Sequence, residues 1–481
     1  MQLVSVGFAG FWLLALAAYY LCPKFQWQIL LAVSLAFYVL YSGTFPVVLI
    51  VCAAIIWMFG YVPEGNKRKW YLKLVIFLHV LLLLFFKLYG HFGMVFGAIV
   101  VPVGLSFFAL AAIGYCIDVH WERCKPEKNY AKLLLFLSFF PSIIQGPINR
   151  WDKLSGEIFK PHVFSKDMVC RGIQRFIWGL FKKLILVDRL LRITESIFES
   201  PENHSGLVLA FGVGCFAVEL YADFSGYMDM VIGIGQTFGI GLPENFKCPY
   251  FSETIAEFWR RWHITLGTWF KDYVMYGFVM SPLGRKIGKS IKKRNKRLGK
   301  LVPTLIGTML VWGLTGLWHG TSCGYLLWGV YYGVIMCISL CIEGFWTEKK
   351  KDVAFFKGKL YKIVCILRTC FLVFIADILI CAGTWDHIKL FVKKIIFEFH
   401  VWDYPSLYAY GRGNAVLILF GVCLMLVVSF VQEKHNSRVE VFLKPPFAIR
   451  WLLWYILIFV ILLFGTYGAG YEAMPFMYQV F

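Results

Sequence analysis

The chain has 481 residues, of which 59% are hydrophobic and only 16% charged, a composition outside the range of soluble globular domains. The formal net charge is +20, but the basic residues stand in short segments between apolar runs, as the positive-inside rule describes for cytoplasmic loops. The composition therefore excludes a water-soluble globular protein, and the distribution of charge argues against a nucleic-acid partner.

Long apolar runs recur along nearly the whole chain, and a bilayer core about 30 Å thick needs about 20 such residues per helical crossing. With two shorter apolar pieces at 133–144 and 228–240, they predict an all-α polytopic membrane protein of about eleven to thirteen transmembrane or re-entrant helices. No soluble domain or internal repeat interrupts them, so we expect one membrane domain over residues 1–481. The expected spans are 2–21, 27–42, 44–61, 71–89, 94–119, 171–191, 205–221, 301–318, 321–342, 361–382, 414–431 and 450–468.

Two basic clusters predict the topology. Lys67, Arg68, Lys69 and Lys73 follow the third span, and Arg123, Lys125, Lys128 and Lys132 follow the fifth, so both loops should be cytoplasmic and the N-terminus outside. The first run lacks the basic segment and cleavage site of a signal peptide and predicts a retained helix. Residues 133–144 are too few for a span and favour a re-entrant hairpin.

The most basic stretch, residues 285–300 (RKIGKSIKKRNKRLGK), contains no acidic residue. A solvated cytoplasmic loop that fixes topology is the simpler interpretation. The alternative is a docking surface for an acidic donor, either a phosphorylated cofactor or an acidic carrier protein, helped by electrostatic steering.

Two histidines stand out because ionisable groups at membrane depth are costly and usually line a cavity or pathway. His319 lies in an apolar run, 301–336, that is too long for one crossing, and Gly316, Gly320 and Gly324 predict a bend or break there. His263 lies in 253–273, where charges and aromatics interleave at helical spacing. This pattern predicts an amphipathic helix in which Glu257 reaches Arg260 and Arg261; an interfacial helix with a structural histidine is the alternative.

A neutral imidazole can take a proton from a hydroxyl while that oxygen attacks a thioester carbonyl. One histidine would be the base, and the other would orient it or donate a hydrogen bond to the oxyanion, as would the indole N–H of Trp318. Haem or metal binding and proton relay in a transporter remain open on these residues alone. Asp223 and Asp229 would cap a helix, pair with an arginine such as Arg260, or orient a histidine, with structural pairing favoured.

Several long motifs carry a resemblance to the membrane-bound O-acyltransferase family. They are VPVGLSFFAL (101–110), LSFFPSIIQGPINR (137–150), YADFSGYMDMVIGIG (221–235), LPENFKCPY (242–250), EFWRRWHITLGTWFKDYV (257–274), GLWHG (316–320) and YGAGYEAMPFMYQVF (467–481). Together these segments resemble the bacterial branch that acetylates alginate or transfers D-alanine to teichoic acid. The resemblance covers most of the chain.

This resemblance implies that His319 matches the essential histidine of the family and His263 its second, upstream histidine. It also implies helices around a central tunnel that links a cytoplasmic donor to an outward-facing acceptor. Trp318, Asp223 and Arg260 are expected in support, for lining the site, orienting a histidine and holding charge. We expect no metal and no tightly bound cofactor, because the acyl thioester, acetyl-CoA or an acyl carrier protein, is a substrate.

The function expected from this resemblance is O-acyl transfer, with acetyl as the first choice, to an extracytoplasmic or cell-wall polysaccharide. The location would be the plasma membrane of a bacterium, among membrane lipids, with an extracellular esterase-like protein as a possible relay. D-alanyl transfer to teichoic acid is the alternative within the family. A transporter or flippase of lipid-linked glycan is the alternative from another class.

Overall fold

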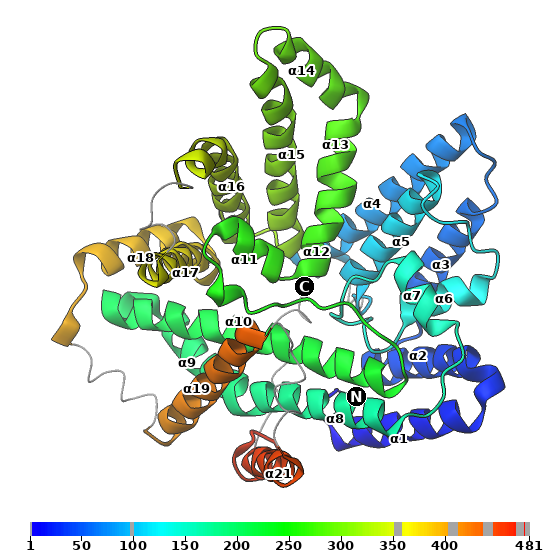
Figure 1. Cartoon of the computed structure of the whole chain (residues 1–481), viewed down its shortest axis with the longest axis horizontal. Coiled ribbons are helices and arrows are strands. Elements are labelled where there is room, and N and C mark those ends of the chain that lie inside the picture. Colours follow the sequence, from blue (N-terminus) through cyan, green and yellow to red (C-terminus); the bar gives the residue numbers. More distant parts are fainter. Residues whose placement is uncertain are drawn as a thin grey trace. The chain divides into compact units, whose positions relative to one another are not determined.

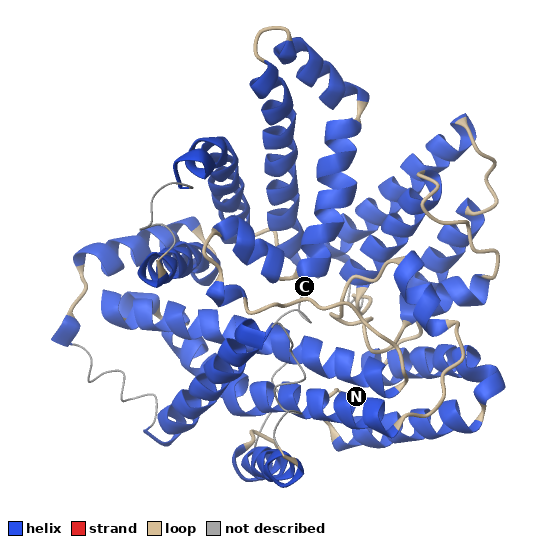
Figure 2. Ribbon diagram, in the orientation of Figure 1, coloured by secondary structure: helices blue, strands red, loops and turns tan. Residues whose placement is uncertain are grey.

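The computed structural model describes residues 2–96, 101–350, 358–402, 412–435, 446–467 and 476. Within these residues the chain folds into helices joined by loops, without a strand (Figures 1 and 2). The predicted all-α class is therefore confirmed. Most of the closing motif at 467–481 lies outside the described residues.

The chain divides into two compact units. Residues 1–180, 224–244 and 475–481 form unit 1, and residues 181–223 and 245–474 form unit 2. Helix α10 (Gly206–Thr237) contributes to both. One domain over the whole chain stays a prediction.

The remaining elements follow in chain order. Unit 1 contains α1 (Val6–Leu21), η1 (Pro23–Phe25), α2 (Gln26–Ser42), α3 (Val47–Phe59), α4 (Asn66–Phe96), α5 (Leu105–His120), α6 (Tyr130–Ser138), α7 (Trp151–Ile158) and α8 (Lys166–Phe181). Unit 2 contains η2 (Lys182–Val187), α9 (Asp188–Phe198), η3 (Pro201–Asn203), η4 (Pro249–Phe251), α11 (Ile255–Arg261), α12 (Ile264–Trp269), η5 (Phe270–Met275), α13 (Tyr276–Met280), α14 (Pro282–Lys292), α15 (Lys296–His319), α16 (Cys323–Lys350), α17 (Lys359–Ala382), α18 (Trp385–Phe397), α19 (Arg412–His435) and α21 (Phe447–Phe464).

Seven helices of the described residues are long and apolar enough to cross a membrane, and α1, α3, α5 and α21 are shorter apolar helices. The seven are residues 23–42, 66–88, 206–237, 296–319, 323–342, 359–382 and 414–435. Together with the shorter helices they agree with a polytopic membrane protein. The nine-residue helix α6 overlaps the first half of the 133–144 region that was expected not to span, and it is too short to cross a bilayer.

Three predicted boundaries are wrong. The expected span at 94–119 is divided, because α4 ends at Phe96 and α5 begins only after Gly104, whose φ of +72° suits glycine and whose backbone touches Ile143. The expected span at 171–191 lies within a longer helical stretch, in which α8, the π-helical η2 and α9 follow one another without a gap from residue 166 to residue 198. Residues 228–237 are not a separate short piece, since α10 continues through them.

Aromatic packing and one charge cluster hold unit 1 together. Phe8 on α1 is fully buried and contacts Phe37 on α2, with ring centroids 5.9 Å apart. Buried Arg175 on α8 donates from Nε to Asp229 at 3.0 Å and from both terminal nitrogens to Glu244 at 2.7 Å. Burial alone would lower the pKa of Arg175, but the two carboxylates raise it overall. Structural pairing of Asp229 is thus confirmed, with Arg175 as partner and not Arg260.

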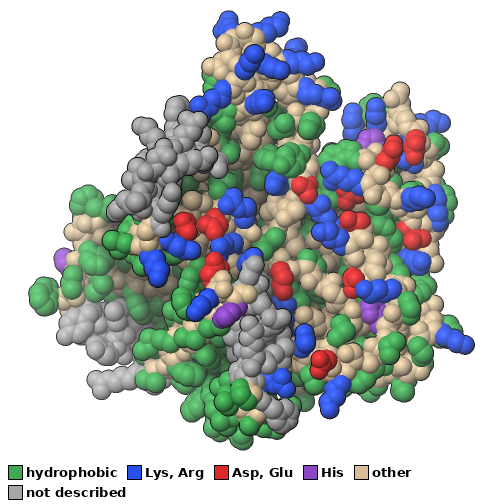
Figure 3. Space-filling model, viewed as in Figure 1, with side chains coloured by type: hydrophobic (Ala, Val, Ile, Leu, Met, Phe, Trp, Pro, Cys, Tyr) green, Lys and Arg blue, Asp and Glu red, His purple; other side chains and the backbone are tan. Residues whose placement is uncertain are grey.

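The basic stretch of unit 2 is not the loop we expected. Residues 282–292 form α14, which packs against α15, and Gly299 allows the close approach because an added Cβ would lie 2.7 Å from Lys292 Cα. Lysine and arginine side chains gather over α14 and its turn to α15 (Figure 3). The stretch is therefore an ordered, highly basic helical hairpin.

Candidate active site

His319 is the last residue of α15 and is only 6% exposed. Gly320 follows it and ends the helix, and α16 begins at Cys323, so the predicted break is confirmed. An added Cβ at Gly320 would lie 2.4 Å from the Tyr325 ring, which stacks on His319 at 6.1 Å. The glycine thus allows the start of α16 to pack against the histidine.

The second histidine lies at a helix break that the sequence did not predict. The expected helix at 253–273 ends at Arg261, and α12 begins at Ile264. His263, between them, has φ of +43° and ψ of +51°, the left-handed region that most residues avoid. At this break His263 is only 3% exposed.

The rings of both histidines pack against the indole of Trp318. The ring centroids of His263 and Trp318 are 6.1 Å apart, and those of Trp318 and His319 are 4.8 Å apart. Burial, and to a smaller extent charge on His319, lower the pKa of His263 well below its ordinary value. His263 is therefore a neutral imidazole near pH 7, which is the form that accepts a proton.

Four aromatic rings close one side of His319. Its ring centroid lies 5.2 Å from that of Trp328, and Trp328 packs against Trp259, Trp312 and Tyr332 at 5.2 to 5.8 Å. These rings come from α11, α15 and α16. The nearly buried imidazole of His319 therefore borders an aromatic cluster, and an apolar surrounding of this kind strengthens hydrogen bonds and charge interactions.

Two of the expected supporting residues lie elsewhere. Asp223 on α10 accepts from Lys183 Nζ at 3.4 Å, and the same ammonium lies 3.1 Å from Asp188. All three side chains are buried, and this pairing accounts for a lysine inside the fold. Arg260 is exposed at the surface of α11. The structure therefore brings together His263, Trp318 and His319, and places Asp223 in a separate ion cluster.

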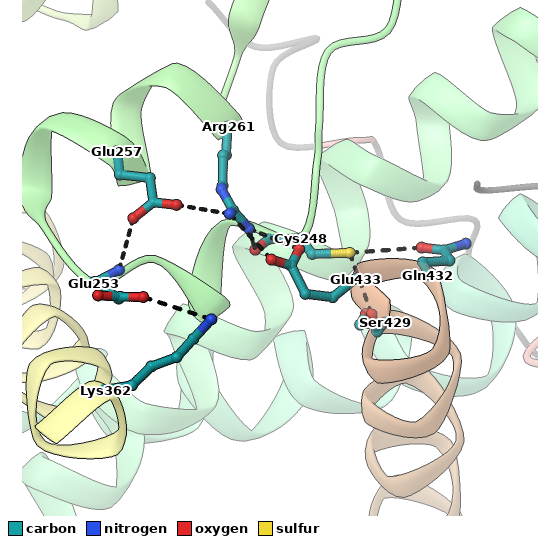
Figure 4. Close-up of polar contacts among 8 residues, drawn as sticks. All are labelled: Cys248, Glu253, Glu257, Arg261, Lys362, Ser429, Gln432 and Glu433. Atoms are coloured by element: carbon teal, nitrogen blue, oxygen red, sulfur yellow. Dashed lines mark hydrogen bonds and ion pairs between the residues drawn. The ribbon is translucent and has the colours of Figure 1, made fainter. Parts of the chain in front are cut away.

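Arg261 makes the ion pairs expected of this helix. Its guanidinium points between two carboxylates (Figure 4), with Nη2 2.6 Å from Glu257 and Nη1 2.7 Å from Glu433 on α19. The i,i+4 pair with Glu257 follows the predicted spacing. The bidentate contact with Glu433 ties the end of α11, two residues before His263, to a helix far away in the sequence.

Asn245 is a buried residue bonded next to His263 that the sequence did not single out. It is fully buried and accepts hydrogen bonds from the backbone and side chain of Thr265, just after His263. Its position inside LPENFKCPY was the only available signal. Among the residues that the structure describes, no group of three or more His, Cys, Asp and Glu side chains is arranged to hold a metal ion.

The geometry defines an all-helical membrane protein with a buried site of two histidines around a tryptophan. Residues 126–376, which include both histidines, match the profile of the membrane-bound O-acyltransferase family. The chain belongs to this family.

Three relatives give the range of similarity. "Probable alginate O-acetylase AlgI" of Pseudomonas syringae pv. tomato is 35% identical over 51% of this chain and 44% of its own. "Peptidoglycan O-acetyltransferase" of Helicobacter pylori is 30% identical over 70% of this chain and 68% of its own. "Teichoic acid D-alanyltransferase" of Bacillus subtilis is 28% identical over 52% of this chain and 61% of its own. The match thus spans about half the length of the alginate relative.

Proposed function

We propose that this protein is an O-acyltransferase that moves an acyl group, with acetyl as the first choice, from a cytoplasmic thioester to a hydroxyl of an extracytoplasmic or cell-wall polysaccharide. The observation that carries the proposal is the buried assembly of His263, Trp318 and His319. Membership of the acyltransferase family supports the reaction class.

The proposed reaction needs a proton acceptor and a hydrogen-bond donor, both in an apolar surrounding. A neutral imidazole takes the proton of the acceptor hydroxyl as its oxygen forms a bond to the thioester carbon. The carbonyl π electrons move to oxygen and are stabilised there by a hydrogen bond. They return as the carbon–sulfur bond breaks, and the imidazolium gives its proton to the departing thiolate. The products are an ester and a thiol.

We assign the base to His319 and the partner role to His263. His319 closes α15 beside the aromatic rings, so its imidazole is enclosed on one side and fixed by the end of a long helix. The lowered pKa of His263 favours a neutral ring that orients or hydrogen-bonds. Trp318, whose indole contacts both rings, is the proposed donor to the oxyanion.

The names of the relatives support the choice of acyl group and acceptor. Two relatives are named for O-acetylation of alginate or peptidoglycan. Each of them shares more identical residues with this chain than the relative named for D-alanyl transfer does. We therefore favour acetyl-CoA as the donor substrate, with no tightly bound cofactor. The proposal places the protein in the plasma membrane of a bacterium, acting directly or through an extracellular esterase-like relay protein.

The experiment that tests the proposal follows label in membranes containing the chain. Labelled acetyl-CoA and labelled D-alanyl carrier protein are supplied in turn to wild type, His319→Ala and His387→Ala, a control at an exposed histidine of α18. We expect label from acetyl-CoA in polysaccharide or a relay protein, lost in His319→Ala and kept in His387→Ala. Transfer from the carrier protein alone would favour D-alanylation of teichoic acid.

The same experiment addresses the alternative from another class. A transporter or flippase of lipid-linked glycan would consume neither thioester, and His319→Ala would leave both donors unchanged. Full transfer by His319→Ala would show that the assigned base is wrong. Equal expression of the variants, measured in the same membranes, is the condition for each comparison.

A further inference from the structure

His263 occupies the position that normally caps a helix. α12 begins at the next residue, and the first amides of any helix lack partners inside it. An N-cap residue usually has an extended backbone and offers its own side-chain oxygen to these amides. His263 has instead a left-handed backbone, and its imidazole lies against Trp318. The cap must therefore come from another segment.

Asn245 supplies it from the loop that precedes η4. Its backbone oxygen accepts from the Ile264 amide at 3.0 Å, and its Oδ1 accepts from the Thr265 amide at 2.9 Å and the Thr265 hydroxyl at 2.7 Å. The first i→i−4 bond of α12 then runs from the Gly267 amide to His263 O. One asparagine thus satisfies the first two amides of α12.

The same loop also holds the other side of the break. The Lys247 amide donates to Arg261 O at 2.9 Å, so residues 245–247 bond the chain before and after Trp262 and His263. Asn245 is fully buried, which makes its side-chain position well determined by packing. The left-handed backbone of a non-glycine residue is costly and persists only where the surroundings enforce it.

We infer that Asn245 is a positioning residue, which caps α12 in place of His263 and so holds the imidazole of His263 in the site. Two functions that one N-cap residue would otherwise combine are thus divided between two residues. Asn245, 20 positions before Thr265 in sequence, caps the helix, and the side chain of His263 is left for the chemistry. The inference rests on the proposed function for its catalytic consequence, and on the hydrogen bonds alone for its structural part.

The test compares Asn245→Ala and Asn245→Asp with wild type and with Thr254→Ala. Thr254 caps the neighbouring helix α11 through its hydroxyl, so its variant loses a similar cap without touching the break at His263. We expect Asn245→Ala to lower kcat by about 100-fold with little change in KM, as displacement of a reacting group does. Asn245→Asp keeps the acceptor at a helix N-terminus and should restore much of kcat, and Thr254→Ala should stay close to wild type.

Hydrogen exchange at the amides of Ile264 and Thr265 provides a readout that does not depend on turnover. Exchange should be faster in Asn245→Ala and near wild type in Asn245→Asp. Turnover of Asn245→Ala equal to that of Thr254→Ala would overturn the inference, as would Asn245→Asp no better than Asn245→Ala. If wild type itself transfers no acyl group, the proposed function fails. The capping role of Asn245 is then tested by hydrogen exchange alone, and unchanged exchange in Asn245→Ala would overturn it.

Discussion

The most informative single residue is His263, because both its backbone conformation and the pKa of its imidazole depart from ordinary values. Its φ lies in the left-handed region, and its ring is almost completely enclosed. Burial disfavours the charged imidazolium and so lowers the pKa. If the imidazole of His263 takes up a proton during catalysis, it therefore releases that proton readily. This behaviour suits a partner of the catalytic base, and it does not suit a residue that stays positively charged.

Replacing His263 by glutamine should flatten the dependence of stability on pH. Since the folded-state pKa is lowered, the unfolded chain binds more protons below about pH 6.5, and the free energy of unfolding falls as the pH falls. The loss is at most about 1.4 kcal/mol per pH unit for this one group. Thermal unfolding in detergent between pH 7.5 and 5, on the scale of this titration, should show a steeper fall for wild type than for His263→Gln.

His387→Gln, at an exposed position of α18, is the control substitution and is measured under the same conditions. Equal slopes for wild type and His263→Gln would show that burial of His263 does not govern the acid sensitivity of the fold.

At the residue scale, the sequence identified the histidines but not the residues that hold them. Two histidines in apolar surroundings were a clear signal because such groups are costly. Asn245 stood out only by its position in the LPENFKCPY motif, since the role of a buried polar side chain is recognised only when its partners, here the amides after His263, are known. The spacing along the helix allowed Glu257 to pair with either Arg260 or Arg261. Arg261 forms the pair, and it also contacts Glu433, which lies 172 positions further along the chain and is not visible in the local sequence.

At the scale of elements, α11 is tied to α19 through Arg261. Replacing Arg261 by lysine should lower the free energy of unfolding by about 1–2 kcal/mol, because an ammonium cannot make the bidentate contact with Glu433. The side chain is 17% exposed, which limits the effect. Arg260→Lys, at the exposed neighbouring position, should change it by less than about 0.5 kcal/mol. Chemical or thermal unfolding of the two variants in the same detergent gives the comparison, and equal losses would refute the tie.

The contact of α15 with α16 offers a second test at this scale. An added Cβ at Gly316 would lie 2.6 Å from Tyr325 O, so Gly316→Ala should separate the helices and cost about 1–3 kcal/mol. Gly313, one turn earlier in α15, has open space around it. Gly313→Ala should be neutral or stabilising by up to about 1 kcal/mol.

Activity should follow the same order, since Gly316 lies three residues before His319. Initial rates of acyl transfer, divided by the amount of folded protein, would show the displacement of His319 directly. A Gly316→Ala variant as stable and active as Gly313→Ala would mean that the close helix contact does not position the site.

The elements differ in how well their sequences predict them. The break after His319 followed from a run too long for one crossing and from three glycines. The break at His263 did not, because charges and aromatics keep their helical spacing through it and the cap comes from a distant loop. The basic stretch was predicted as a loop because its composition is that of a solvated segment. Packing against α15 instead folds residues 282–292 into α14.

At the scale of the whole molecule, composition alone defined the class. Apolar runs of bilayer length predict helices because only helices satisfy their own backbone within a membrane. They do not predict where a helix continues through polar residues, as α10 does with Asp223 and Asp229. The buried partners Lys183 and Arg175 make that continuation possible, and neither partnership is visible in local sequence.

The central claim is that His263 and His319 act as one catalytic unit. The most direct measurement is the initial rate of acyl transfer for wild type, His263→Ala, His319→Ala and the double variant, each normalised to folded protein and supplied with the donor that wild type uses. Because groups that act together lose their effect together, the double variant should be no slower than the slower single variant. Losses that multiply in the double variant would contradict a shared site.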